Sequence, residues 1–99
     1  MKQTTSRAAI RFGAKVRQAR LALGLSQESI AELAQMHVTN YGKIERGLAN
    51  PSLVTILRIA SVLGTDIAPL TEGLTRDDLP ADFDVLSADE FVRERTRRR

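Results

Sequence analysis

The sequence predicts an all-α domain of five helices and allows a sixth near the C-terminus. Apolar residues recur three and four positions apart along most of the 99-residue chain, which is the spacing of one helix face. Gly24, Gly47, Gly64 and Gly73 punctuate these runs at points where a helix commonly ends. Aromatic residues make up only 4% of the chain, so the core has to be built from Leu, Ile, Val and Ala, as in a small helical bundle.

The first helix is expected over residues 7–23, with Gly24 as its C-cap residue. Its core-facing stripe consists of Phe12, Val16, Ala19 and Leu23. Ser26 suits the N-cap of a second helix, expected over residues 27 to about 35. A third helix is expected over residues 38 to about 46.

A fourth helix is expected over residues 53–63, behind an N-cap at Ser52. Its apolar stripe consists of Leu53, Ile56, Leu57, Ala60 and Leu63. Asp66 is the best N-cap for a short fifth helix, which ends at Gly73.

We expect two parts in the chain: a globular domain over residues 1–73, then an acidic linker and an arginine-rich helix or tail over residues 74–99. Ser87 and Glu90 stand at the spacing of a capping box, which predicts a sixth helix over residues 88 to about 97. Such a short helix is marginal alone. We therefore expect the six apolar residues around it to pack on the same chain or on a partner copy. They are Leu79, Phe83, Val85, Leu86, Phe91 and Val92.

The net charge of +3 is unevenly distributed. Residues 1–71 carry nine Lys and Arg against four Asp and Glu, whereas residues 72–90 carry one Arg against seven acids. Residues 91–99 then carry five Arg against one Glu. A basic globular part suits a polyanionic partner such as nucleic acid, and on composition alone an ordinary solvated surface is an equal alternative.

The residue inventory argues against an enzyme. His37 is the only histidine and no cysteine is present, so we expect no catalytic site, no metal site and no cofactor. Four acids cluster late in the chain: Asp77, Asp78, Asp82 and Asp84. They lack the glycine turn of a calcium loop, and we interpret them as a solvated linker. No stretch approaches the roughly 18 apolar residues of a membrane span, and there is no signal-peptide pattern, so we expect no membrane partner. The absence of cysteine fits a reducing cytoplasm, where we expect the protein.

Residues 26–47 have the pattern of two short helices joined by a tight turn. The outward face of the second of these helices is left with Val38, Thr39, Asn40 and Lys43. These side chains are small or polar, and they are of the kind that reaches base edges in the major groove of DNA.

This stretch resembles the helix-turn-helix of the Cro/C1-type (XRE-family) transcriptional regulators. The supporting pattern runs from Leu25-Ser26-Gln27-Glu28 through Ile44-Glu45-Arg46-Gly47 and Asn50-Pro51-Ser52-Leu53 to Leu63-Gly64. Within that family the sequence is most similar to the small controller proteins of restriction-modification systems. The resemblance covers roughly residues 11–70. It implies a λ-repressor-like DNA-binding fold and a sequence-specific transcriptional regulator in the prokaryotic cytoplasm, associated with the nucleoid.

The resemblance also implies roles for particular residues. Base contacts are expected from the start of the third helix, through Val38, Thr39, Asn40 and Lys43. Contacts to the DNA backbone are expected from Ser26, Gln27, Arg46 and Asn50. The family pattern further pairs Arg20 with Glu45 across the edge of the core, against the simpler alternative of two surface charges.

Two residues depart from the family pattern. Gln35 stands in the turn, where relatives usually have glycine, and His37 stands where they usually have Ser or Thr. A left-handed Gln35 costs about 1 kcal/mol, so we expect the turn to differ slightly from that of relatives.

A single domain of this kind buries little DNA surface, and its relatives pair two copies on a palindromic operator. We therefore expect a homodimer on double-stranded DNA, with candidate interface residues Ile67, Leu70, Phe91 and Val92. The alternative is an antitoxin-like or adaptor protein whose C-terminal tail binds a protein partner.

Overall fold

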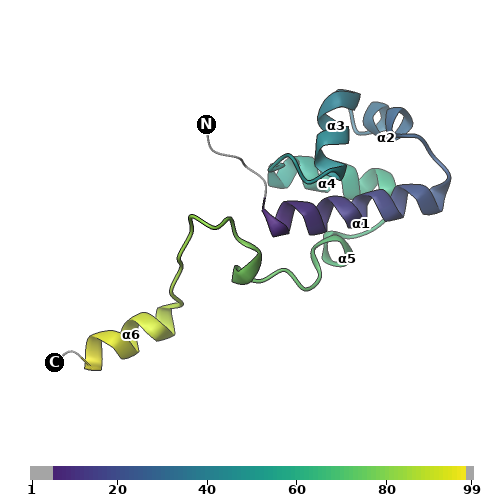
Figure 1. Ribbon diagram of the computed structural model, residues 1–99. Helices are drawn as coiled ribbons and strands as arrows, with labels where there is room; N and C mark the ends of the chain where they lie inside the picture. Colours follow the sequence, from purple (N-terminus) through teal and green to yellow (C-terminus); the bar gives the residue numbers. More distant parts are fainter. Residues whose placement is uncertain (1–5, 98–99) are drawn as a thin grey trace.

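The computed structural model describes residues 6–97, and among these residues every regular element is helical (Figure 1). Five helices form one body: α1 (Arg7–Leu23), α2 (Gln27–Leu33), α3 (Val38–Glu45), α4 (Leu53–Leu63) and α5 (Ile67–Thr71). A 3-10 turn, η1 (Arg76–Asp78), and the C-terminal helix α6 (Ala88–Arg97) follow. The predicted all-α fold, with its sixth helix, is confirmed. None of these helices is both long enough and apolar enough to span a bilayer.

Serine residues begin several helices, as predicted. The hydroxyls of Ser26 and Ser52 each accept a hydrogen bond, at 3.1 Å, from the backbone N–H three residues further on. Ser87 and Glu90 form the predicted capping box. The Glu90 amide donates to the Ser87 hydroxyl at 3.1 Å, and the Ser87 amide donates to Glu90 Oε1 at 2.8 Å. Asp66 precedes α5 but makes no side-chain capping bond.

The core lies where α1 packs against α3, α4 and α5, with α2 covering α3 and α4. Its buried residues are Phe12, Val16, Ile30, Ala31, Tyr41, Ile44, Ile59, Ala60, Leu63 and Leu70. Gly13 lies at the crossing of α1 and α3. A Cβ atom at Gly13 would lie 2.2 Å from the carbonyl oxygen of Ile44, so only glycine allows the two helices to approach this closely.

On α1 and α4, the predicted apolar stripe includes residues that lie outside the buried face of the helix. Leu23 at the end of α1 is 49% exposed. On α4, Leu53 and Leu57 are 66% and 47% exposed, whereas Ile59, which the predicted stripe omitted, is fully buried. The prediction of these three leucines as core residues is therefore wrong. Leu53 and Leu57 are exposed because α1, α2 and α5 meet α4 along the face that holds Ile59, and Leu23 is the last residue of α1.

The acidic segment after α5 is not solvated throughout. Asp78 is 2% exposed, and its carboxylate accepts hydrogen bonds from Arg11 at 2.9 Å and from the Thr75 amide at 3.0 Å. Arg7 lies 3.6 Å from the same carboxylate. The interpretation of this acid as part of a solvated linker is wrong, because two arginines one turn apart on α1 offer it charge-assisted bonds.

Helix α6 lies apart from the five-helix body (Figure 1). A bond between Arg76 and Glu90 Oε1, 2.7 Å long, ties its first turn to η1. The six apolar residues around it are 39% to 59% exposed: Leu79, Phe83, Val85, Leu86, Phe91 and Val92. Packing of these residues on the same chain is therefore not observed, and packing on a partner copy stays a prediction.

Candidate nucleic-acid interface

Helix α3 presents one face to the core and the other to solvent. On the inner face, Tyr41 is fully buried and Ile44 is 4% exposed. The outer face carries the four residues expected to contact bases, and all four are exposed: Val38, Thr39, Asn40 and Lys43. Together they offer an amide that both donates and accepts, a cation, a hydroxyl and methyl groups, which can meet base edges in the major groove.

The turn between α2 and α3 depends on a left-handed residue. Gln35 has a φ of 58°. Its amide donates to the Glu32 carbonyl at 3.0 Å, and the Met36 amide donates to the Ala31 carbonyl at 2.9 Å, which together make a Schellman motif. His37 then occupies the N-cap of α3 without a side-chain capping bond.

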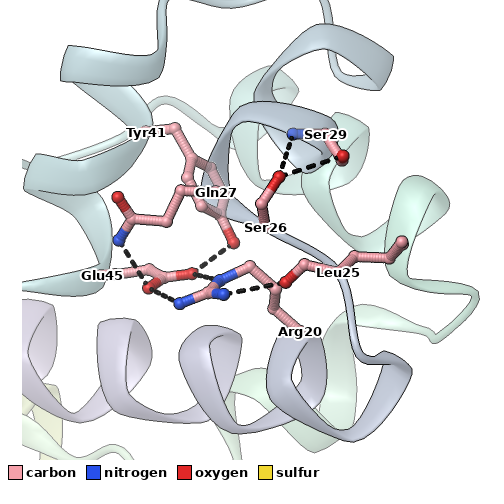
Figure 2. Close-up of polar contacts among 7 residues, drawn as sticks. All are labelled: Arg20, Leu25, Ser26, Gln27, Ser29, Tyr41 and Glu45. Carbon is pink, nitrogen blue, oxygen red and sulfur yellow. Dashed lines mark hydrogen bonds and ion pairs between the residues drawn. The ribbon is translucent and has the colours of Figure 1, made fainter.

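Arg20 of α1 and Glu45 of α3, which the family pattern pairs, lie together in a buried position (Figure 2). Arg20 Nε donates to Glu45 Oε2 at 2.7 Å, and Arg20 Nη2 donates to Glu45 Oε1 at 3.0 Å. The side chains of Arg20 and Glu45 are 10% and 1% exposed. The Tyr41 hydroxyl donates to Glu45 Oε2 at 2.6 Å. This bidentate pair ties the inner face of α3 to α1.

The hydrogen bonds of this network favour the charged forms of Glu45 and Arg20. Burial alone would raise the pKa of Glu45, but hydrogen bonds from Arg20, Tyr41 and Gln27 outweigh burial and hold that pKa below its ordinary value. The hydrogen bond to Glu45 raises the pKa of Arg20. Burial and the bond to Glu45 raise the pKa of Tyr41. The network therefore holds one anion, one cation and a neutral phenol at neutral pH.

The side chains of Gln27 and Ser26 both make hydrogen bonds within the protein. Gln27 Nε2 donates to Glu45 Oε1 at 2.9 Å, so this half-buried amide orients the carboxylate (Figure 2). The Ser26 hydroxyl caps α2 through the Ser29 amide. What these two residues can offer to a DNA phosphate is the positive N-terminal end of α2 rather than a free side chain.

Arg46 and Asn50, the other two residues expected at the DNA backbone, are both exposed. Arg46 is the C-cap residue of α3. Its guanidinium lies back along the helix beside Gly42: a Cβ atom at Gly42 would lie 3.1 Å from Arg46 Nη1. Lys43 and Arg46 thus place two cations near one end of α3.

Sequence reasoning missed two residues that support α3. Gly13 stands inside a helical pattern, and an isolated glycine there is a known signal of close packing that could have been used. Arg58 of α4 reaches the carbonyls at the end of α2, and no pattern in the sequence marks it. Among residues 6–97 no group of three acidic or histidine side chains gathers in a way that could hold a metal ion.

A family model for helix-turn-helix domains matches residues 16–70, which is more than half of the chain. The control protein C.BamHI of Bacillus amyloliquefaciens is 42% identical over 65 residues, covering 65% of this chain and 80% of that protein. The transcriptional regulator YonR, derived from the SPbeta prophage of Bacillus subtilis, is 32% identical over 62 residues. The matched residues cover 63% of this chain but only 57% of YonR.

The crystal structure of the restriction-modification controller protein C.AhdI from Aeromonas hydrophila matches this structure with a TM-score of 0.61. The two chains are 40% identical, and the match covers 63% of this chain and 94% of the other. The similarity to controller proteins, which the sequence motifs predict, is confirmed.

Proposed function

The chain belongs to the Cro/C1-type (XRE) helix-turn-helix family of DNA-binding transcriptional regulators, and from this premise we propose that it reads a specific operator in double-stranded DNA. The observation that carries the proposal is the two-sided character of α3. Its outer face holds exposed groups suited to base edges, while its inner face is anchored by the buried pair of Arg20 and Glu45. The proposal includes no catalytic step. In this role the protein works in the prokaryotic cytoplasm, at the nucleoid.

We assign specificity to the outer face of α3. Asn40 can donate and accept at an adenine edge, and Lys43 can donate to guanine or to a phosphate. Val38 and Thr39 can contact a thymine methyl group. All four side chains are exposed, and three of them, Val38, Thr39 and Asn40, lie in the first turn of the helix, which is the part that meets bases in this motif.

We assign affinity to groups around that helix. Arg46 and Asn50 are exposed and polar, and they can contact phosphates without reading sequence. Ser26 and Gln27 contribute through the first turn of α2, whose N–H groups have no acceptor within the helix. These contacts hold the domain in register while α3 reads the bases.

Two copies on a palindromic operator are the proposed active form. A partner copy would cover apolar surface that the chain itself leaves open, since Phe91 and Val92 on α6 are 51% and 56% exposed. Ile67 is half-buried on α5, whereas Leu70 is 3% exposed and belongs to the core, which leaves little of Leu70 for a partner. Sedimentation tests this: replacing Phe91 and Val92 by Ala should favour the monomer, and Arg93→Ala should not.

Selection from random double-stranded DNA tests the proposed function. The wild-type chain should enrich one sequence with two-fold symmetry, and its affinity should fall steeply with salt because phosphate contacts release counterions. A variant with both Asn40 and Lys43 replaced by Ala should stay folded, because both side chains are exposed, yet lose that enrichment. The absence of any enriched sequence with wild-type protein would exclude the proposal.

The exposed apolar residues around α6 also support the alternative function, an antitoxin-like or adaptor protein. Of these, Phe83, Leu86 and Phe91 are 59%, 54% and 51% exposed and could seat a protein partner. A stoichiometric partner that is captured by the full chain and lost when these residues are replaced by Ser would support this function. Unchanged capture by the altered chain would argue against it.

A further inference from the structure

Four helices of the body end in the same turn, in which one backbone N–H bonds three residues back and the next bonds five residues back. At the ends of α1, α3 and α4 the left-handed residue is glycine, namely Gly24, Gly47 and Gly64. At the end of α2 it is Gln35, which is the only non-glycine residue with positive φ in the part of the chain that the structure describes. The end of α2 therefore carries backbone strain that the other three ends avoid.

Arg58 of α4 lies at this strained end. Its Nε donates to the Ala34 carbonyl at 2.9 Å, and its Nη2 donates to the Gln35 carbonyl at 2.8 Å. The two carbonyls belong to the peptide planes on either side of the Gln35 Cα atom. Because each peptide unit is rigid, holding both planes sets φ and ψ of Gln35. Carbonyls at a helix C-terminus also lack intrahelical donors and attract a cation.

We propose that Arg58 is a positioning residue for DNA reading, which holds the left-handed turn at Gln35 and so fixes the direction in which α3 leaves α2. The helix begins at Val38, three residues after Gln35, and Asn40 follows on its outer face. A change in φ or ψ at Gln35 would turn that face relative to α2. This inference rests on the proposed function, because the consequence for DNA requires that α3 reads bases.

The first test measures the turn without DNA. Arg58→Lys keeps the charge but loses the planar fork that reaches both carbonyls. Amide exchange at Gln35 and Met36 should then rise roughly tenfold, the scale of losing one charge-assisted hydrogen bond. Adding Gln35→Gly should bring the exchange rates back toward wild type, because glycine adopts the left-handed conformation freely. Arg17→Lys on the exposed face of α1 is the matched control. Unchanged exchange in Arg58→Lys would overturn the proposal.

The second test compares binding to the selected operator with binding to random DNA. Arg58→Lys should lower operator affinity roughly tenfold, if the lost bond displaces α3, and leave random-DNA affinity nearly unchanged, because the cation remains. Gln35→Gly, added to the Arg58→Lys variant, should restore operator affinity. Equal losses on both DNAs without this rescue would mean that Arg58 supports DNA binding in general and not the reading of the operator through the turn, which overturns the proposal.

The two tests distinguish a failure of the role proposed for Arg58 from a failure of the proposed function. If the wild-type chain selects no DNA sequence, the proposed function fails. Amide exchange alone then tests whether Arg58 stabilises the left-handed turn at Gln35. If the wild-type chain selects a sequence but neither readout changes in Arg58→Lys, only the inference fails. The double variant with Gln35→Gly covers the case in which Arg58→Lys alone folds poorly, since it removes the strain that Arg58 opposes.

Discussion

The Tyr41 hydroxyl donates to Glu45 Oε2 at 2.6 Å, one turn further along α3 (Figure 2). Arg20 from α1 and Gln27 from α2 bond to the same carboxylate. Glu45 is thus the point at which three helices meet, and all its partners lie on the inner side of α3. The outer side, with the residues proposed to contact bases, is held in place by this buried polar centre.

Replacing Glu45 by Ala should destabilise the fold and loosen α3 together. The change leaves the Arg20 guanidinium buried without its partner, and removing one member of a buried pair costs on the order of 3–5 kcal/mol. Chemical denaturation measures this loss. Tyr41→Phe is the control: it removes one hydrogen bond and should cost about 1.5 kcal/mol. A melting curve of the Glu45 variant that matches wild type would contradict the role given to the pair.

Replacing Gly13 by Ala should also destabilise the protein, although alanine is the better helix former. The added Cβ would lie 2.2 Å from the Ile44 carbonyl, so α1 and α3 have to move apart. Overpacking of this kind costs about 1–3 kcal/mol. The same change at Gly24 meets nothing within 4 Å, and only its left-handed backbone should resist it. A larger loss of stability at Gly24 than at Gly13 would show that the helix crossing is not tight.

Replacing Asp78 by Asn should release η1 from α1. The variant loses the ion pair with Arg11 and the attraction of Arg7, while a hydrogen-bond acceptor remains. Amide exchange at Leu79, whose N–H bonds to the Arg76 carbonyl, should become faster. Asp77→Asn, at the exposed neighbouring position, should leave exchange unchanged. Equal exchange in the two variants would mean that the buried carboxylate does not hold the segment.

Glu90 should keep its charge below the pH at which an ordinary glutamate becomes neutral. The hydrogen bond from Arg76, followed by that from the Ser87 amide, lowers the pKa of Glu90 from 4.5 to about 2. Because the folded pKa is the lower one, the stabilisation of the first turn of α6 is complete above the unfolded value. It is lost as pH falls toward about 2. An NMR titration of the Glu90 carboxyl should show this low value, and Arg76→Ala should raise it. Titration of wild-type Glu90 near 4.5 would refute the capping geometry.

Substitutions at Asn40 and Arg46 should separate specificity from affinity. Asn40→Ala should relax the preference at one base position, since a good base contact is worth roughly 1–3 kcal/mol. Arg46→Ala should weaken binding to all sequences about equally and reduce the salt dependence, as expected of a phosphate contact. Selection from random DNA with each variant measures both effects, and the reverse outcome would exchange the two assignments.

The sequence by itself determined the α-helices α1 to α6, their approximate ends and the outward face of α3, but not the 3-10 turn η1. Ser52 before α4, Gly64 after it and the capping box at Ser87 act through bonds within a few residues, so they can be identified without knowledge of the fold. The exposure of Asn40 and Lys43 likewise follows from helical spacing alone.

Only the tertiary structure decided which polar groups are buried and what they hold. Arg11 donates a hydrogen bond to Asp78, which lies 67 positions away in the sequence. Arg58 donates to the Ala34 carbonyl, which lies 24 positions away. No local pattern encodes such pairs, because each depends on which helix surfaces are brought together by burial of the core. The same packing turned the Gln27 amide inward to Glu45 and left Leu53 on the solvent side of α4. Local hydrogen bonding and spacing therefore specify the helices, whereas the contacts that orient α3 depend on the packing of the helices together.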